Sequence, residues 1–206
     1  MGKCKSALVN IRKGITRLPD YIIGRLHFVF HYDKKYLSAK WFKGKGGGVG
    51  AVGWKWARSD WKNCKKLNVN PGVRWPVSPR VEVLCPENII FDPDDLNNFQ
   101  TFGVYYQANA TIAIGKGTFI GPNVGLITRN HDLLDPEKHA EAKPITLGEA
   151  CWIGMNSMIL PGVELGPHTV VGAGAVVTKS FPEGYCVIAG NPAKIIKEIQ
   201  ETESEV

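Results

Sequence analysis

The sequence predicts an all-β fold, a parallel β-helix, for residues 81–206, and three recurring features support this prediction. A large aliphatic residue returns at every sixth position, glycine usually follows it directly, and a small or β-branched residue comes four positions after it. A period of six fits neither an α-helix nor an isolated strand, but each hexapeptide of a β-helix forms one short strand and one corner. The aliphatic positions are Ile114, Ile120, Leu147, Ile153, Ile159, Leu165, Val171 and Val177. The small positions are Thr118, Val124, Cys151, Ser157, Val163, Thr169 and Ala175.

Each of these features has a structural role in such a coil. The aliphatic side chain fills the interior, the small residue fits where two walls converge, and glycine tolerates the backbone angles of a tight corner. The aliphatic series continues forward to Leu126 and backward through Ala108, Phe102, Leu96 and Ile90. We therefore expect these side chains to face the interior as well.

A protruding loop separates the two runs of the repeat. Leu147 follows Leu126 by 21 residues, which is not a multiple of six, so the intervening chain must leave the coil. The insert spans residues 128–144, is polar and shows no strand pattern. Because long loops on regular scaffolds usually serve function, we expect the functional site here.

Residues 1–80 form a separate basic region that the sequence predicts to be mainly helical. Residues 1–66 contain 16 Lys and Arg against 3 Asp and Glu, a net charge of +13, whereas the rest of the chain carries 9 against 16, a net charge of −7. Such asymmetry indicates an anionic partner for the basic part. We expect no nucleic acid, because no RNA-binding motif accompanies the Lys- and Trp-rich segment.

An apolar stripe bordered by basic residues lies within this region. Two interpretations remain open: peripheral contact with an anionic membrane surface, or ordinary packing on a neighbouring element. The stripe consists of Tyr21, Ile22, Leu26, Val29, Phe30 and Leu37.

The C-terminal end and the cysteines complete this picture. The repeat breaks at residues 180–184, and we expect a short helix over residues 192–200 to close the coil. Five cysteines without a CxxC spacing predict neither a disulfide nor a metal site. With no signal peptide evident, these features predict a cytoplasmic protein, and peripheral contact with a membrane is one of the two open interpretations of its basic region.

Several segments resemble those of the hexapeptide-repeat acyltransferases. The similarity is greatest to the O-acetyltransferases of maltose, galactosides and bacterial capsular or lipopolysaccharide glycans, and it covers about residues 90–199. The segments are Ile120-Gly121-Pro122-Asn123-Val124, Asn130-His131-Asp132, Cys151-Trp152-Ile153-Gly154-Met155-Asn156, Ile159-Leu160-Pro161-Gly162-Val163, Val171-Gly172-Ala173-Gly174-Ala175-Val176-Val177-Thr178-Lys179 and Ala189-Gly190-Asn191-Pro192-Ala193-Lys194.

The resemblance implies a left-handed β-helix with three hexapeptides per turn, assembled as a homotrimer. It also implies acetyl-CoA as the donor, bound in the groove between neighbouring subunits and reached by the loop of the next subunit. The function expected from it is CoA-dependent O-acetylation of a sugar hydroxyl, in bacterial surface-glycan biosynthesis.

His131 is our candidate general base, since it stands where similar enzymes carry their catalytic histidine. Acetyl transfer to an alcohol needs the hydroxyl proton removed, and imidazole titrates close to working pH. Asp132, Asp135 or a backbone carbonyl could orient the imidazole, and the sequence leaves this choice open.

The remaining candidates follow from the resemblance, except that His139 is a candidate because it shares the loop, and that Gln100 or a backbone N–H would replace the asparagine that some relatives carry in the early coil. Four residues are candidates for contact with the acceptor or the oxyanion: Gln100, Asn130, Asp132 and His139. Six residues are candidates for contact with CoA: Trp152, Ala173, Thr178, Lys179, Lys194 and Lys197. The basic side chains among them stand out in an otherwise acidic half, which independently favours an anion site.

Three alternatives share the predicted scaffold. An N-acyltransferase acting on a nucleotide-linked amino sugar would use the same fold and donor, and a non-catalytic β-helix scaffold would need no site. A carbonic anhydrase of the β-helical type would need three histidine ligands, but His131, His139 and His168 lack its spacing.

Overall fold

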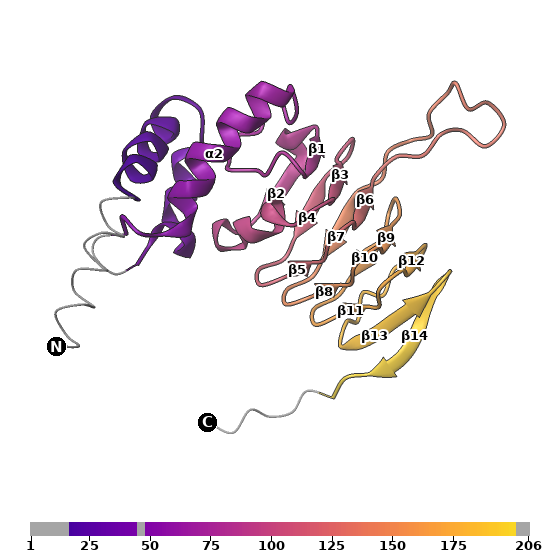
Figure 1. Ribbon diagram of the computed structural model, residues 1–206. Coiled ribbons are helices and arrows are strands. Elements are labelled where there is room, and N and C mark those ends of the chain that lie inside the picture. Colours follow the sequence, from indigo (N-terminus) through magenta and orange to yellow (C-terminus); the bar gives the residue numbers. More distant parts are fainter. Residues whose placement is uncertain (1–16, 45–47, 201–206) are drawn as a thin grey trace. The chain divides into compact units, whose positions relative to one another are not determined.

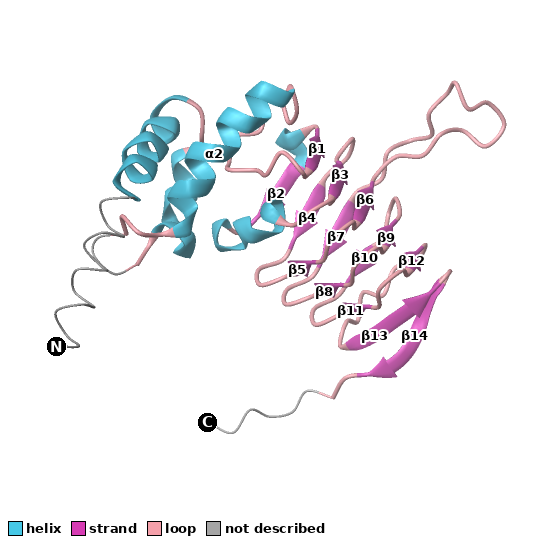
Figure 2. Cartoon of the chain, viewed as in Figure 1, coloured by secondary structure: helices cyan, strands magenta, loops and turns pink. Residues whose placement is uncertain are grey.

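The computed structural model describes residues 17–44 and 48–200, and the chain divides into two compact units, Met1–Pro79 and Arg80–Val206 (Figure 1). The first sixteen residues of the predicted basic region and the last six of the chain lie outside the described residues. The first unit is helical in its described part, so the label all-β does not extend to it. The prediction of parallel β-structure is confirmed for the second unit (Figure 2).

The first unit is built around aromatic side chains. The Phe28 ring lies 5.1 Å from Phe42 and 6.3 Å from Trp54, between centroids. Gly24 allows the first helix to approach α2 closely, because a Cβ there would lie 3.1 Å from the Trp54 carbonyl oxygen. The helices comprise residues 17–30, the 3-10 turns η1 (Lys34–Ser38) and η2 (Lys40–Phe42), and α2 (Val52–Leu67).

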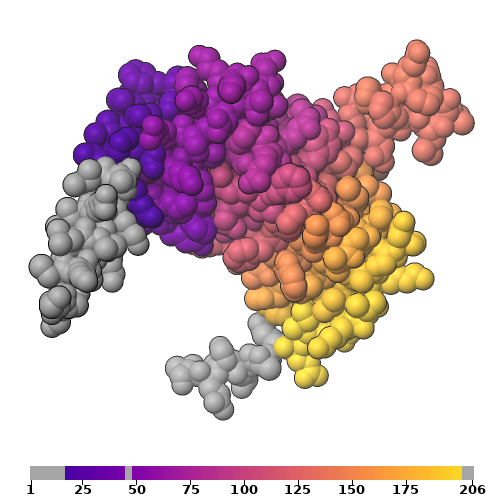
Figure 3. Space-filling view, viewed as in Figure 1, coloured from indigo at the N-terminus to yellow at the C-terminus, as the bar shows by residue number. Residues whose placement is uncertain are grey.

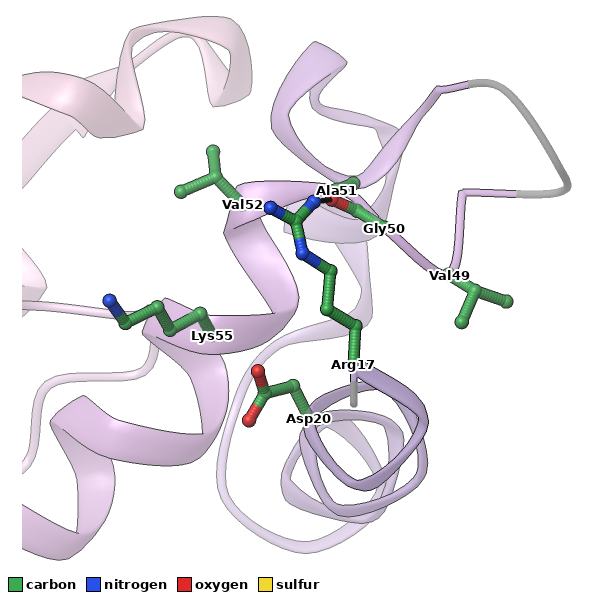
Figure 4. Close-up of a pocket in the computed structure, with 7 residues that line it drawn as sticks. All are labelled: Arg17, Asp20, Val49, Gly50, Ala51, Val52 and Lys55. Carbon is green, nitrogen blue, oxygen red and sulfur yellow. Dashed lines mark hydrogen bonds between the residues drawn. The ribbon is translucent and has the colours of Figure 1, made fainter. Parts of the chain in front are cut away.

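A small hollow of ≈ 90 Å³ lies beside the start of α2 (Figure 4). Arg17 and Asp20 line it from the first helix, and Lys55 lines it from α2. The Arg17 guanidinium donates a hydrogen bond to the Gly50 carbonyl at 2.6 Å, which ties the first helix to the segment before α2. No helix within residues 17–44 and 48–200 has both the length and the apolar character needed to cross a bilayer.

The second unit consists of three sheets that the chain visits in turn. Sheet A has the order β1 (Glu82–Leu84), β3 (Tyr105–Gln107), β6 (Gly125–Ile127), β9 (Met158–Ile159), β12 (Val176–Val177). Sheet B has the order β2 (Ile89–Phe91), β4 (Ile112–Ile114), β7 (Ile145–Leu147), β10 (Glu164–Leu165). Sheet C has the order β5 (Phe119–Ile120), β8 (Trp152–Ile153), β11 (Val170–Val171), β13 (Cys186–Gly190), β14 (Ala193–Glu198).

Successive coils pair in parallel with the register that the repeat predicts. Leu147 is paired with Leu165 and Ile153 with Val171, so one coil takes 18 residues. The aliphatic and small positions of the repeat from 114 to 177 are all buried, which confirms their interior placement. Residues 128–144 leave the coil between β6 and β7, at the corner between sheets A and B.

Close stacking of the coils explains the glycine that follows the aliphatic residue. A Cβ on Gly115 would lie 2.4 Å from the Gly148 carbonyl oxygen of the next coil, which no side chain tolerates. Gly115 and Gly148 do not have positive φ. Other residues at the corners do, such as Asn123 with a φ of 56° and Asn156 with a φ of 61°. The expected reason, a corner angle reserved for glycine, is therefore wrong for these positions, and lack of space is the cause.

The first coil departs from the predicted six-residue series. Leu96 and Ala108 are buried, but Ile90 and Phe102 are 62% and 53% exposed, so the prediction that they face inward is wrong. The strand pairing gives the reason: β3 is offset from β6 by 20 residues and β2 from β4 by 23, instead of 18, so the six-residue phase is lost in this coil, where the 3-10 segment η4 (Pro93–Gln100) lies between β2 and β3. η4 caps the coil, since the Asn98 side chain bonds the Thr118 carbonyl and the Ile120 N–H. A further 3-10 turn, η3, spans Pro86–Asn88.

The predicted C-terminal helix over residues 192–200 is wrong, because the chain forms β14 (Ala193–Glu198) antiparallel to β13. A helix would leave the outer edge of β13 with unpaired backbone groups, whereas a returning strand satisfies them. Ile195 and Ile196 are β-branched, which favours the extended conformation.

We expect Leu96→Ala and Phe102→Ala to differ sharply in stability. Leu96 is fully buried, so truncation should lower the free energy of unfolding by about 2–5 kcal/mol through lost contacts and a cavity. Phe102 is half exposed, so its truncation should cost less than about 1 kcal/mol. Urea unfolding followed by circular dichroism measures both values, and equal costs would contradict the exposed position of Phe102.

Candidate active site

The loop over residues 128–144 folds as a narrow antiparallel ribbon that stands clear of the coil (Figure 3). Its backbone hydrogen bonds join Lys143 to Thr128, Ala140 to Asn130, and Asp132 to Lys138. His131 and His139 form a β-bridge opposite each other, with ring centroids 4.5 Å apart. The ribbon therefore presents two histidines side by side, with Asn130 and Asp132 flanking the first.

The imidazole of His131 is held by the loop itself. Its Nδ1 lies 2.6 Å from the Pro136 carbonyl oxygen. A carbonyl can only accept, so Nδ1 carries the proton and donates, which leaves the lone pair on Nε2. His131 is exposed, so Nε2 is available to an incoming hydroxyl. Among the alternatives that the sequence left open, a backbone carbonyl is the group that orients the imidazole.

Asp132 shapes the turn that brings this carbonyl into place. Its Oδ1 accepts the N–H groups of Leu134 and Asp135 at 2.9 and 3.0 Å, a turn stabilised by the side chain of its first residue. These two hydrogen bonds lower the pKa of the Asp132 carboxyl, so it is ionised at neutral pH. Asp135 in turn accepts the N–H of Glu137 and pairs with Lys138 at 2.9 Å.

His139 is a neutral neighbour of the candidate base. Contact with the loop's own atoms displaces water from the ring and, with the nearby positive charge of Arg129, lowers the pKa of His139. Arg129 also fastens the ribbon, since its Nε donates to the Ala140 carbonyl at 3.3 Å. The lowered pKa favours the neutral form of His139.

The base of the loop is anchored by a residue that the sequence did not single out. Gln107, at the end of β3, accepts the Arg129 N–H on its side-chain oxygen at 3.0 Å and is hydrogen-bonded to Tyr105. Gln100, the predicted oxyanion contact, lies at the end of η4, between sheets C and A. Gln107 is paired with Ile127, just before the loop begins, and only this register between β3 and β6 could have indicated its amide as a contact of the loop.

An exposed row of side chains crosses sheet C. Phe119, Trp152, Val170 and Val187 are paired in register on successive strands, so their side chains share the outer face. Trp152 is 59% exposed and presents a flat apolar wall to solvent. The candidate CoA residue Trp152 thus stands within a continuous apolar row.

The two lysines of β14 join this face. Lys197 pairs with Val187 and Lys194 with Ala189, while Ile196 is an extra residue where the register shifts. Because paired residues share a face, the bulge places both lysines on the outer side of sheet C. A positive edge therefore borders the apolar row that contains Trp152.

The other candidate CoA residues lie at two corners. Ala173 is exposed at the corner between sheets C and A, where Gly174 donates its N–H to the Met155 carbonyl at 2.9 Å. Thr178 and Lys179 are exposed at the corner between sheets A and B, after β12, and the Lys179 ammonium lies 5.5 Å from the Phe181 ring. This second corner is the one from which the loop departs.

One chain does not bring the candidate base and the sheet C residues together. A coil runs through sheets C, A and B in that order, so the corner between A and B lies opposite sheet C. His131 projects from that corner, whereas Trp152, Lys194 and Lys197 lie on the far wall. Within one chain, the two groups therefore lie on different sides of the coil.

The remaining titratable residues of the repeat are placed elsewhere. His168 stacks on Tyr185 at the corner between sheets B and C, so it is not joined with the two loop histidines. Cys151 is buried in its small-residue position, and burial raises the pKa of its thiol. Within residues 17–44 and 48–200, no cluster of three His, Cys, Asp or Glu side chains has the arrangement of a metal site.

Comparison with known proteins identifies relatives of this chain. A family model for the bacterial transferase hexapeptide (six repeats) matches residues 144–179. The chain is 37% identical over 135 residues to a Saccharomyces cerevisiae protein provisionally named acetyltransferase YJL218W, a match covering 58% of this chain and 68% of that protein. It is also 37% identical over 108 residues to the galactoside O-acetyltransferase of Escherichia coli K12, covering 51% and 53%.

A solved structure, galactoside acetyltransferase in complex with coenzyme A, is 37% identical over 48% of this chain and 50% of that one, with a TM-score of 0.45. The repeat, its register and the extent of the yeast match define a class of acyltransferases built on six-residue repeats. The chain belongs to the hexapeptide-repeat acetyltransferase family. It spans about half the length of the E. coli enzyme.

We expect the ¹⁵N spectrum of His131 to show a proton on Nδ1 and none on Nε2, because Nδ1 donates to the Pro136 carbonyl. Asp132→Ala should give a mixture of tautomers, since the turn loses its two side-chain hydrogen bonds. Asp132→Asn, whose amide oxygen still accepts, should retain the single tautomer. An Nε2–H form in the wild type, or an unchanged spectrum in Asp132→Ala, would contradict this geometry.

Proposed function

We propose that this protein is a CoA-dependent O-acetyltransferase that moves acetyl from acetyl-CoA to a sugar hydroxyl, with His131 as general base. The observation that carries the proposal is the 2.6 Å contact between His131 Nδ1 and the Pro136 carbonyl oxygen. It leaves Nε2 as an exposed acceptor on a protruding loop, in a chain whose family consists of acetyltransferases.

The chemistry balances with one base. The acceptor hydroxyl attacks the thioester carbonyl while its proton passes to His131 Nε2, and the tetrahedral intermediate expels the CoA sulfur. The imidazolium returns the proton to that sulfur, which gives an acetyl ester and free CoA. The Pro136 carbonyl keeps the imidazole in place in both protonation states, because Nδ1 donates in each.

Asn130, Asp132 and His139 would lie around the acceptor in this proposal, since they flank His131 on the ribbon. Asp132 would act mainly by holding the turn, as its Oδ1 accepts two backbone N–H groups. Gln100 would contribute to the oxyanion contact only from the corner between sheets C and A.

The donor would lie along sheet C and its neighbouring corner. Trp152 and Ala173 would contact the acetyl and pantetheine end, and Lys194 and Lys197 would meet the phosphates as point charges. Thr178 and Lys179 would contact the adenosine end from the loop corner. These residues lie on different sides of one coil, which supports a homotrimer of left-handed β-helices with each site between two subunits.

The setting proposed for this reaction is bacterial surface-glycan biosynthesis in the cytoplasm, where sugar precursors are built. The E. coli relative is named a galactoside O-acetyltransferase, which favours a sugar acceptor. The same proposal includes peripheral contact of the basic first unit with an anionic membrane.

His131→Ala should lower kcat for acetyl transfer to a galactoside or maltose by about 10²- to 10⁴-fold, the usual contribution of a general base. The KM for acetyl-CoA should change little, because the donor lies on sheet C. Glu137→Ala, on the same loop and outside the candidate site, is the matched control. Steady-state release of CoA thiol measures these rates, and undiminished activity in His131→Ala would exclude this residue as the base.

Calorimetric titration of acetyl-CoA tests the donor site separately from the base. Wild type and His131→Ala should bind alike, whereas Lys194→Glu should bind roughly tenfold or more weakly through loss of a charge-assisted contact. Dephospho-CoA should be less affected by the charge reversal if Lys194 meets the 3′-phosphate.

Lys116→Glu is the control for this titration, since it reverses a charge beyond the opposite end of sheet C and should leave affinity unchanged. Failure of the folded wild type to bind acetyl-CoA would end the acyltransferase proposal and favour a non-catalytic scaffold. Donor binding with transfer only to an amino sugar would instead favour N-acylation.

A further inference from the structure

The first helix of the basic unit exposes a continuous apolar face. Five large side chains recur at spacings of three and four residues, so they lie on one side of the helix. Their exposed fractions run from 46% to 68%, well above those of side chains packed in a core. The five residues are Leu18, Ile22, Leu26, Val29 and Phe30.

The opposite side of the same helix already packs in the unit. Gly24 and Phe28 are buried and contact Trp54 of α2, and the Tyr21 ring lies edge-on to the same indole at 5.0 Å. The helix therefore has two apolar sides, and only one of them serves the unit's own core. Packing on a neighbouring element, the ordinary explanation of an amphipathic helix, is satisfied by the side that includes Phe28.

A hollow of ≈ 480 Å³ adjoins the exposed face. Leu26, Val29 and Leu37 give it an apolar lining. Arg25 and Lys34 line it as well, and both are exposed. The arrangement thus combines a volume suited to hydrocarbon with two positive charges beside it.

The acidic residues of this unit do not offset its positive surface. Asp20 pairs with Arg58 at 2.8 Å, and Asp33 lies 3.3 Å from Arg74. The third carboxylate, Asp60, is buried. The positive charges beside the apolar face, on Arg25, Lys34 and Lys35, are exposed.

We propose that this face, Leu18, Ile22, Leu26, Val29 and Phe30 with Arg25, Lys34 and Lys35, is a membrane-docking surface for an anionic phospholipid bilayer. The proposal rests on the peripheral membrane contact of the proposed function and identifies the surface that makes it. The helix lies along the bilayer with its apolar residues among the acyl chains, and the basic side chains contact the phosphates. Long basic side chains suit this position, because their stems cover apolar surface while their charges stay in water.

Charge complementarity selects this partner. A protein groove would satisfy the apolar face but would not require an excess of positive charge around it. A nucleic acid would use the charge but would leave five aliphatic and aromatic side chains in water. An anionic bilayer accommodates both properties at once.

Sedimentation of the full-length protein with vesicles tests the proposal. We expect binding to phosphatidylcholine vesicles that contain phosphatidylglycerol, and weak binding to pure phosphatidylcholine. Binding should weaken with added salt, because the charges are exposed. Leu26→Ser/Phe30→Ser should bind at least about tenfold more weakly through lost apolar burial, and Arg25→Glu/Lys34→Glu should bind at least about tenfold more weakly through reversed charge.

Leu67→Ser is the matched control, since Leu67 is 59% exposed at the end of α2 and lies outside the surface. It should bind as the wild type does. Circular dichroism and acetyl transfer to a soluble sugar should be unchanged in Leu26→Ser/Phe30→Ser and in Arg25→Glu/Lys34→Glu. These controls separate lost docking from lost folding or lost activity.

Three results would overturn the proposal. The wild type could fail to bind anionic vesicles, or Leu67→Ser could lose as much binding as Leu26→Ser/Phe30→Ser does. Alternatively, light scattering could show that Leu26→Ser/Phe30→Ser changes the oligomeric state, in which case a second copy covers the face. None of these results bears on acetyl transfer to a soluble acceptor, so the proposed activity stands or fails independently.

Discussion

The structure of the second unit depends on how closely successive coils approach. A Cβ on Gly154 would lie 2.5 Å from the Val171 carbonyl oxygen of the next coil, so this position accepts only glycine without a shift of the backbone. With that spacing, the strands β7, β8 and β9 pair with the strands 18 residues further on, and interior side chains stack in columns. Outward side chains form rows across a sheet, and an insertion can leave only at a corner. The positions of the loop and of the Trp152 row both follow from this stacking.

The candidate site residues are held in position in two different ways. Trp152, Lys194 and Lys197 are placed by long-range pairing, because their strands are held in register across sheet C. His131 is placed by a contact within its own loop, to the Pro136 carbonyl, and Gln107 of β3 holds the base of that loop. The coil therefore fixes where the loop begins, and the loop fixes how the imidazole points.

The sequence predicted the regular part of the fold because a single six-residue repeat specifies it. Every interior position proposed between 114 and 177 is buried, since stacking forces the same side chain size at the same place in each coil. The predictions failed where the 18-residue spacing is lost, at Phe102, because β3 is offset from β6 by 20 residues, and at residues 193–198, where the edge of β13 selects a strand. Gln107 and the Pro136 carbonyl could not be found from the period, because their partners depend on register between coils and on a turn.

The orientation of the candidate base depends on hydrogen bonds rather than on burial. Leu133 and Leu134, at the tip of the ribbon, are 97% and 96% exposed, so no core holds the turn in place. The two N–H groups bound by Asp132 and the Pro136 carbonyl bound by His131 close the turn instead. Such a loop can lose the geometry of its base while the β-helix stays folded, and the coil can be destabilised without disturbing the imidazole. The orientation of His131 and the stability of the coil thus depend on separate sets of contacts, which meet at the base of the loop, where Gln107 accepts the Arg129 N–H.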